Sequence, residues 1–407
     1  MGQQAPIRVT LILFFCILLI PVWAAAQEMG EGIRFGAFSL HPSLYTAMRY
    51  NDNVFFLPNN YRPENDRSIP QGIESDFVWN VVPEISFDLK VPSFSGKLDY
   101  RYYNDTYLGY DDPDKNHHRL NGSNHTFSGL ADYNAPFGLM LGASESYGII
   151  QTYETTDQFV DFQKGDQTHN DARGWLGYHY GPENNIYFRG TYTNLIDKYK
   201  TVPEFNKMSQ YADGNLSMKF FPRTAVVAQG GYGMIRHEDI TDADADLWWA
   251  QGGVQGQITT VLFLTVLGGW TQATYQTFDS FSGWIGNAEL AALFGNETKL
   301  AIGYRRLLRD AVDTNFYTSH EGYLNFSRLW ASRLTTSLFA DYQNNDFSEP
   351  LARHEDFIQG EIDLNYQFVY WLFIGGGYRL EELLFDDGTI KTTTVRNIGT
   401  VHLQAQF

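Results

Sequence analysis

Hydrophobic and polar residues alternate along much of the chain. In the stretch from 359 to 368, Ile362, Leu364, Tyr366 and Phe368 share one face, and acidic or amide side chains fill the positions between them. The stretches that begin at 299, 333 and 372 follow the same rule. Successive side chains of a β-strand point to opposite faces, whereas an amphipathic helix repeats near 3.6 residues. The pattern therefore predicts strands with one apolar and one polar face.

Short turns and long polar segments divide these strands in alternation. The turns lie at 91–93, 135–138, 181–185, 222–224, 259–260, 295–297, 331–332 and near 371, and the long segments include 57–72, 111–118, 155–170 and 238–245. A short-turn end and a long-loop end are typical of outer-membrane barrels, whereas a soluble sandwich or propeller would not combine long strands with such uneven connections. We predict an all-β fold, an antiparallel up-and-down transmembrane β-barrel that begins near Phe38 and ends at Phe407. Eight turns give 18 strands, or 16 if the glycine-rich segments 229–233 and 252–257 are misassigned. A barrel of this size has a backbone diameter of roughly 35 Å and room for a water-filled lumen.

The N-terminus has the features of a signal peptide. Arg8 precedes an apolar run over 11–20, Pro21 breaks the run, and small residues end at Ala26. We expect residues 1–26 to be removed and residues 27–407 to form the barrel, in the outer membrane of a Gram-negative cell. The single cysteine, Cys16, would leave with the signal peptide, and Phe15 before it disfavours a lipoprotein acylation site. The mature chain then has neither a disulfide nor a thiolate metal site.

Composition narrows the function classes. The 407 residues are 16% aromatic, which excludes a disordered chain, and the net charge of -18 argues against nucleic-acid binding. The last strand alternates and ends on the aromatic Phe407, which resembles the C-terminal signal of barrels that the barrel-assembly machinery inserts. The partners expected from this class are that machinery, outer-membrane lipid and lipopolysaccharide. Acidic residues in the long loops suit divalent cations that bridge to lipopolysaccharide phosphates, or equally a solvated rim. They are Asp111, Asp112, Asp114, Glu238, Asp239, Asp242, Asp244, Asp386 and Asp387.

The first two strands carry a more specific resemblance. The segment 41–55, which contains Pro42 and Asn51-Asp52-Asn53, resembles the opening strand of the β-barrel porin-2 family. The segments 74–77, with Asp76, and 82–85, with Pro83, are similar to that family's second strand. The resemblance implies an association with exopolysaccharide or capsule export and with periplasmic export proteins. It covers about the first sixty mature residues.

Sites for metals, sugars and catalysis have weak support. Asn51, Asp52 and Asn53 offer oxygen ligands for a cation, but such clusters more often form turns. The aromatic residues Tyr100, Tyr102, Tyr103, Tyr107, Tyr110, Trp248, Trp249 and Trp284 suit either sugar stacking or the interfacial girdle of a barrel. Ser144, Ser146 and His125 are residue types that nucleophilic catalysis uses, but their spacing in the sequence does not indicate a catalytic site. We expect no enzyme activity, no cofactor and no metal.

Charged residues on the polar face of the late strands are the most informative candidates. We predict that Arg305, Glu321, Arg333, Glu361, Arg379 and Arg396 line the lumen. They either pair and stiffen the wall or, where an arginine is unpaired, attract anionic groups, because rings of charge set pore selectivity. The resulting hypothesis is an outer-membrane channel for exported exopolysaccharide or capsule polymer. The alternatives are a general or solute-selective diffusion porin and a non-conducting surface or adhesion barrel.

Overall fold

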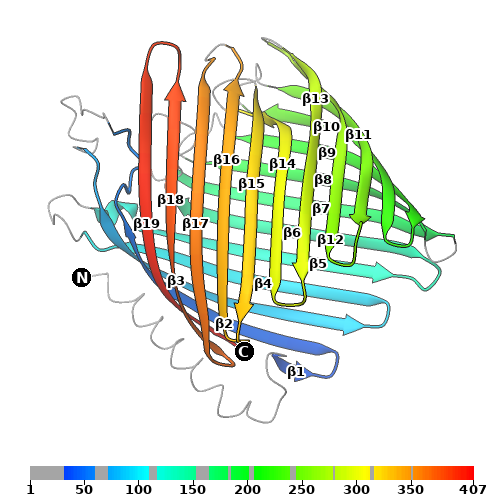
Figure 1. The fold of residues 1–407 in the computed structure, drawn as a ribbon, viewed down its shortest axis with the longest axis horizontal. Helices are drawn as coiled ribbons and strands as arrows, with labels where there is room; N and C mark the ends of the chain where they lie inside the picture. Colours follow the sequence, from blue (N-terminus) through cyan, green and yellow to red (C-terminus); the bar gives the residue numbers. More distant parts are fainter. Residues whose placement is uncertain are drawn as a thin grey trace.

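The computed structural model is a closed antiparallel barrel of 18 strands, β2 to β19, with one short extra strand, β1 (Figure 1). It describes residues 32–59, 72–109, 117–152, 165–181, 185–200, 206–238, 244–277, 280–311, 316–349 and 352–407. The predicted signal peptide, including Cys16, lies outside these ranges. Among the described residues no helix is long and apolar enough to cross a membrane.

The strands are 13 to 16 residues long, apart from β1. In the first half they are β1 (Ile33–Phe35), β2 (Phe38–Asn51), β3 (Asp76–Val91), β4 (Phe94–Tyr107), β5 (Gly122–Asn134), β6 (Leu139–Thr152), β7 (Gly165–Tyr180), β8 (Ile186–Tyr199), β9 (Lys207–Phe221) and β10 (Thr224–His237). In the second half they are β11 (Ala245–Gln257), β12 (Leu262–Tyr275), β13 (Phe281–Phe294), β14 (Thr298–Asp310), β15 (Phe316–Trp330), β16 (Leu334–Phe347), β17 (His354–Val369), β18 (Leu372–Asp386) and β19 (Lys391–Gln406). A 3-10 helix, η1 (His117–Leu120), precedes β5.

The barrel closes between its first and last strands. Consecutive strands from β2 onward pair antiparallel, and β19 pairs with β2 from Ile398↔Asn51 to Gln406↔Ser43. The backbone N–H of Phe407 also donates to the carbonyl of Pro42 at 3.1 Å. The predicted fold class, the 18 strands and all eight short turns are therefore confirmed, including the glycine-rich strands β10 and β11. Two strand boundaries were wrong: β1 lies before the predicted start, and β7 begins at Gly165, inside the predicted loop 155–170.

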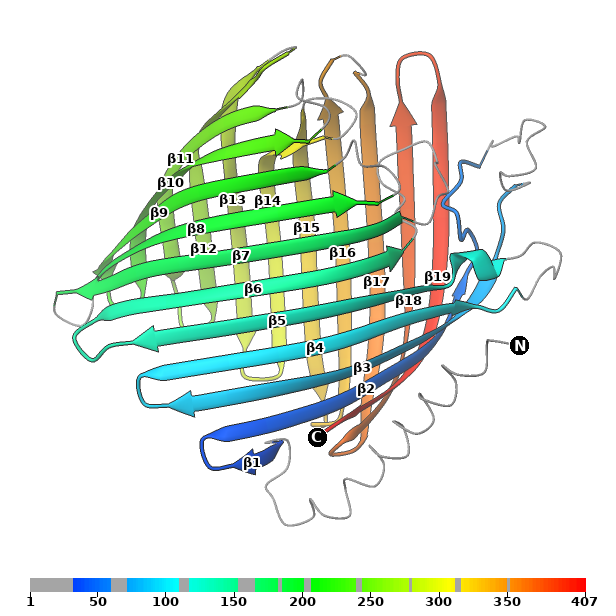
Figure 2. The ribbon, with the colours of Figure 1, turned by 180° about the vertical axis from the view of Figure 1, so that it is seen from behind.

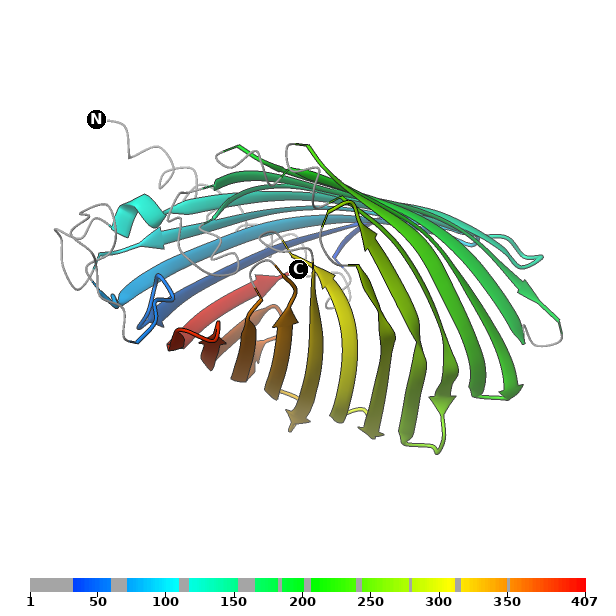
Figure 3. The same cartoon turned by 90° about the horizontal axis from the view of Figure 1, so that it is seen from above.

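The ring of strands is flattened. Seen from above, one wall is broad and shallow, and the wall bends sharply where the green strands turn from one side to the other (Figure 3). Seen from behind, β4 to β9 cross the strands of the opposite wall at a steep angle (Figure 2). At the long-loop ends near the sharp bend, Ile235, Ala245, Ala273 and Tyr275 pack together with Leu247, Phe281, Leu308 and Phe316. The Lys207 Nζ also pairs with the Asp310 Oδ2 at 3.0 Å, which ties β9 to β14 although they are not neighbours in the wall.

The outer surface has the composition of a lipid-facing wall. On β17 the apolar side chains of Ile362, Leu364 and Phe368 are 39%, 45% and 57% exposed, as predicted for the outward face. Exposed aromatic side chains form two belts. The belt toward the long loops includes Tyr50, Trp79, Trp248, Trp270, Trp284 and Tyr342, and the belt toward the short turns includes Phe87, Tyr133, Phe137, Tyr178, Phe294 and Trp330. An apolar band between aromatic girdles is the surface of an outer-membrane barrel, so the predicted location in the outer membrane is confirmed.

The predicted aromatic set divides between the two faces. Tyr100 and Tyr102 contact His125 on the outside, with ring centroids 6.2 and 4.9 Å from it. Tyr103 and Tyr107 occupy the alternate positions of β4 and therefore face inward. Trp249 faces inward for the same reason, whereas Trp248 belongs to the outer belt. Tyr110 lies outside the described residues.

Candidate functional site: the charged inner wall and the barrel mouth

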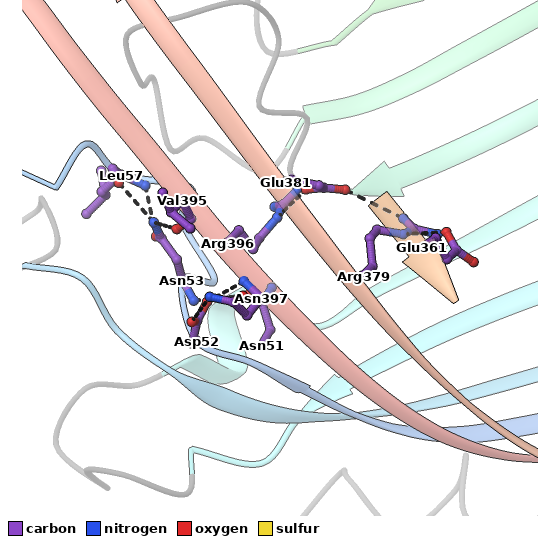
Figure 4. A network of polar contacts seen from close by, with 10 residues as sticks. All are labelled: Asn51, Asp52, Asn53, Leu57, Glu361, Arg379, Glu381, Val395, Arg396 and Asn397. Carbon is purple, nitrogen blue, oxygen red and sulfur yellow. Dashed lines mark hydrogen bonds and ion pairs between the residues drawn. The ribbon is translucent and has the colours of Figure 1, made fainter. Parts of the chain in front are cut away.

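Charges of alternating sign cross β17, β18 and β19 on the inner face. Glu361 lies opposite Arg379, and Glu381 lies opposite Arg396, in the strand register. The Arg379 Nε donates to Glu361 Oε2 at 2.8 Å, the Arg379 Nη1 lies 3.6 Å from Glu381 Oε1, and the Arg396 Nε donates to Glu381 Oε2 at 2.7 Å (Figure 4). We call these four residues the inner ladder. Its two carboxylates match its two guanidiniums, so Arg379 is not an unpaired cation.

A second inner group carries an excess of positive charge. Glu321 on β15 is fully buried and accepts hydrogen bonds from the side chains of both Arg305 and Arg309 on β14. Those two side chains are 45% and 40% exposed. The Arg305 Cζ lies 5.3 Å from the centre of the Tyr323 ring, another inward residue. One carboxylate thus serves two guanidiniums, and the group, which we call the Glu321 clamp, has a net charge of +1.

Five of the six predicted lumen residues occupy the inward face of strands, and one does not. Arg305, Glu321, Glu361, Arg379 and Arg396 alternate with the exposed apolar residues of their strands. Arg333, by contrast, follows the end of β15 at Trp330 and precedes the start of β16 at Leu334, so it is an exposed turn residue and not a strand residue. The alternation of β16 could not reveal this, because it continues formally through the turn.

The Asn51-Asp52-Asn53 segment ties the first loop to the last strand. The Asn53 Nδ2 donates to the carbonyls of Leu57 at 2.9 Å and Val395 at 3.0 Å, and its Oδ1 accepts from the Leu57 N–H at 2.9 Å. The Asp52 carboxylate accepts from the backbone and the side chain of Asn397 at 2.6 and 2.7 Å (Figure 4). These oxygens are occupied by the protein's own donors. The segment acts as a latch, which supports the turn interpretation and not the cation site.

The latched loop fills part of the mouth at the long-loop end. Val54, Phe55 and Leu57 pack with Leu120 of η1 and against the inward-facing Tyr107. We call these side chains the mouth cluster. At position 56 the backbone adopts φ 51°, and the Arg396 Cζ lies 4.4 Å from the centre of the Phe56 ring. The mouth cluster is therefore joined to the inner ladder through Phe56.

A buried histidine joins the two loops of the mouth. His117 of η1 is 1% exposed and hydrogen-bonds Asp76 through Nδ1 at 2.9 Å and Glu74 through Nε2 at 2.5 Å. The Phe55 ring meets the imidazole edge-on at 5.7 Å. Asp76 also accepts from the Gly109 N–H at 3.1 Å. Asp76 of the predicted motif thus organises the mouth, whereas Pro42 and Pro83 lie on the outward side of β2 and β3, facing Ile85 and Leu44 in the register.

The other candidate sites are not assembled. Within the described ranges no group of three or more His, Cys, Asp or Glu residues could hold a metal ion. Ser144 and Ser146 alternate with the exposed Tyr147 and face inward, whereas His125 contacts the outward-facing Tyr100, so the three residues lie on opposite faces of the wall.

The acidic residues of the long-loop end that the structure describes accept hydrogen bonds from nearby backbone and side-chain groups. The Ile390 and Thr389 N–H groups donate to Asp387 at 2.6 and 2.8 Å and lower the pKa of its carboxyl. Hydrogen bonds from Asn206 and Lys198 lower the pKa of Glu238. Asp244 is buried and accepts from the His237 N–H at 2.8 Å. Asp386 is half-buried at the end of β18 and is paired with Lys391. Asp111, Asp112, Asp114, Asp239 and Asp242 lie outside the described residues.

Comparison with solved structures returns large outer-membrane proteins at very low sequence identity. The chain is similar to the outer membrane protein opdK of Pseudomonas aeruginosa, with 10% identity, a TM-score of 0.49 and coverage of 91% of this chain and 99% of that one. It is similar to OccAB4 of Acinetobacter baumannii, with 10% identity, a TM-score of 0.47 and coverage of 90% and 98%. A ferric enterobactin receptor of Pseudomonas aeruginosa gives 6% identity, a TM-score of 0.48 and coverage of 94% and 82%. No family model and no curated protein matches the chain, so the resemblance to the porin-2 family stays a prediction. The chain is an outer-membrane β-barrel on the evidence of its own closed ladder and apolar outer surface.

Proposed function

We propose that the protein is a passive channel through which a polysaccharide chain crosses the outer membrane. The observation that carries the proposal is the combination of aromatic rings and polar groups on the inner wall. The Arg189 Cζ lies 4.8 Å from the centre of the Trp175 ring, and Tyr45 and His402 stand 5.3 Å apart on the β19–β2 side. Both pairs occupy inward positions of their strands.

Sugar rings suit such a wall because they present C–H groups to aromatic faces and hydroxyls to polar neighbours. An aromatic side chain offers a large, rigid contact surface, and a neighbouring guanidinium supplies hydrogen-bond donors. The inner ladder also carries no net charge, because its two carboxylates match its two guanidiniums, so these four positions would not hold a charged polymer in place. The wall therefore offers many weak contacts, which is what passage of a long chain requires.

Block of ion current by added polysaccharide tests the proposal. The purified chain in a planar bilayer should show steps of conductance that a soluble capsule-type polysaccharide reduces in proportion to its concentration. Trp175→Ala should weaken this block, whereas Trp248→Ala, which removes a belt residue from the outer face, should not. Open-channel current that is insensitive to polysaccharide would reject the export function, although the protein would still be a channel.

A diffusion porin is the second candidate, favoured by the mouth cluster. Its buried side chains narrow the mouth, as a size filter for small solutes would. Liposome swelling distinguishes the two: fast permeation by disaccharides without block by polymer supports the porin. A barrel that folds and shows neither current nor swelling would instead be the non-conducting surface protein.

A further inference from the structure

An arginine faces outward at the level where the outer leaflet carries its headgroups. Arg306 follows the exposed Tyr304 by two residues on β14 and contacts the exposed Trp284 of β13, so it shares their outward face. It lies eight residues above Thr298, where β14 begins. At about 2.5 Å of height per residue for a strand tilted ~40°, this is about 20 Å above the short-turn end of the strand. The apolar band of such barrels is ~25 Å tall, so Arg306 lies near its upper edge.

The wall splits above this arginine. The β13–β14 ladder ends at the pair Gly286↔Arg306, although β13 continues to Phe281 and β14 continues to Asp310. Above that pair, the end of β14 packs inward instead, since Leu308 joins the inner cluster around Tyr275. Arg306 thus lies at the last paired position of the β13–β14 ladder, and we call the stretch above it, where these two strands are not hydrogen-bonded to each other, the seam.

Neighbouring side chains fix the guanidinium in place. Its Cζ lies 4.5 Å from the centre of the Trp284 ring, its Nη1 donates to the Trp284 carbonyl at 2.6 Å, and its Nε donates to the His320 Nε2 at 3.2 Å. Because that nitrogen accepts, the proton of His320 is on Nδ1, which donates to the Tyr304 hydroxyl at 2.7 Å. A guanidinium has five N–H donors, and among the described residues only two of those on Arg306 are used.

We propose that Arg306, with Trp284 and His320, binds a phosphate group of lipopolysaccharide at this seam. A planar guanidinium binds phosphate through two parallel hydrogen bonds, and the phosphorylated lipid lies in the outer leaflet, beside the long-loop end. The nearest carboxylate on the same row is Asp356 of β17, three strands or about 14 Å away, and it accepts from Tyr342 and Asn344 at 2.8 Å. The aromatic ring beneath the guanidinium suits the boundary between headgroup and acyl chain.

The same strand pair supplies a matched control at the opposite end. Arg328 of β15 lies 3.9 Å above the ring of the exposed Trp330, in the belt near the short turns. It is an outward arginine on an aromatic ring, like Arg306, but it has no histidine partner among the described residues and lies on the side of the inner leaflet. Arg306→Gln and Arg328→Gln therefore each remove one guanidinium from an outward-facing tryptophan ring, at opposite ends of the wall.

Binding of short-chain lipopolysaccharide to the whole refolded barrel in detergent tests the site, with bound lipid counted by native mass spectrometry. Arg306→Gln should weaken binding about tenfold, whereas Arg328→Gln and wild type should agree within twofold. Enzymatically dephosphorylated lipid should bind wild type as weakly as native lipid binds the Arg306→Gln variant. Equal losses in both variants, no loss in Arg306→Gln, or full competition by millimolar inorganic phosphate would each overturn the proposal.

A folding defect can be separated from a binding defect. The glutamine amide nitrogen takes the place of the Arg306 Nε along the side chain and can still donate to the His320 Nε2, so the variant should keep the wild-type heat-modifiable migration without lipid. If the Arg306→Gln variant does not assemble, Arg306→Lys takes its place, because lysine keeps the positive charge but lacks the two parallel N–H donors of a guanidinium. Weaker binding of native lipid by this lysine variant, with a further loss for dephosphorylated lipid, supports the site. Equal binding of native and dephosphorylated lipid rejects it.

Discussion

Replacing Glu321 by glutamine should make the channel more selective for anions. The substitution preserves the shape of the side chain but removes the one carboxylate that Arg305 and Arg309 share, so the Glu321 clamp changes from a net charge of +1 to +2. Both arginine side chains are more than a third exposed to the lumen, so water can solvate them after the change, and we expect the barrel to assemble.

The size of the selectivity change follows from the geometry. A unit charge acts on an ion ~6 Å away with about 0.7 kcal/mol in water, and screening in ~0.1 M salt reduces this to about 0.4 kcal/mol. The change stabilises a passing anion and destabilises a passing cation by this amount. The anion-to-cation permeability ratio should therefore increase about fourfold.

Reversal potentials of planar bilayers under a tenfold potassium chloride gradient measure this ratio. The control is Glu145→Gln on β6, which removes a carboxylate from the outward face, where Glu145 accepts from Asn170 at 3.0 Å between the exposed Leu141 and Tyr147. That variant should keep the wild-type ratio. An unchanged ratio in Glu321→Gln, or equal shifts in both variants, would show that the Glu321 clamp does not face the ion path.

Three further predictions concern the wall and the mouth. Arg379→Ala should shift selectivity toward cations in the same bilayer assay, because it leaves Glu361 and Glu381 with one arginine fewer; a shift toward anions would contradict the inner ladder. Ile362→Arg places a charge on the lipid face near mid-strand and should destabilise the barrel by about 2–4 kcal/mol, whereas Glu361→Gln beside it should assemble normally, as judged by the heat-modifiable fraction on a detergent gel. Asn53→Ala removes three hydrogen bonds of the latch and should cost about 1–3 kcal/mol and raise the mean conductance as the mouth cluster detaches; unchanged current with a normal unfolding midpoint would contradict that role.

The sequence predicts the barrel well because the membrane imposes a simple rule on each strand. Outward residues such as Ile362 and Leu364 must be apolar, whereas the residues between them need not be. The alternation and the short turns are therefore enough to locate the strands in the sequence. The rule fails where lipid is not the neighbour. Arg306 and His320 are outward and polar because they lie at the edge of the apolar band, and alternation alone would not place them there.

Partners across strands cannot be read from alternation. Arg379 was predicted to line the lumen, but its neutralisation depends on the register that puts it opposite Glu361 and beside Glu381. The latch is a contact between Asp52 and Asn397, which only barrel closure brings together. Tyr102 and Tyr103 lie on opposite faces because successive side chains of a strand alternate. The aromatic composition of this segment alone does not show that division.

The proposed channel function requires that this barrel encloses an open, water-filled path. Single-channel recording from the purified, heat-modifiable protein in a planar bilayer tests it most directly. We expect discrete current steps whose selectivity changes when Glu321 is replaced by glutamine. A membrane that contains the folded barrel and stays silent at every applied voltage would contradict it.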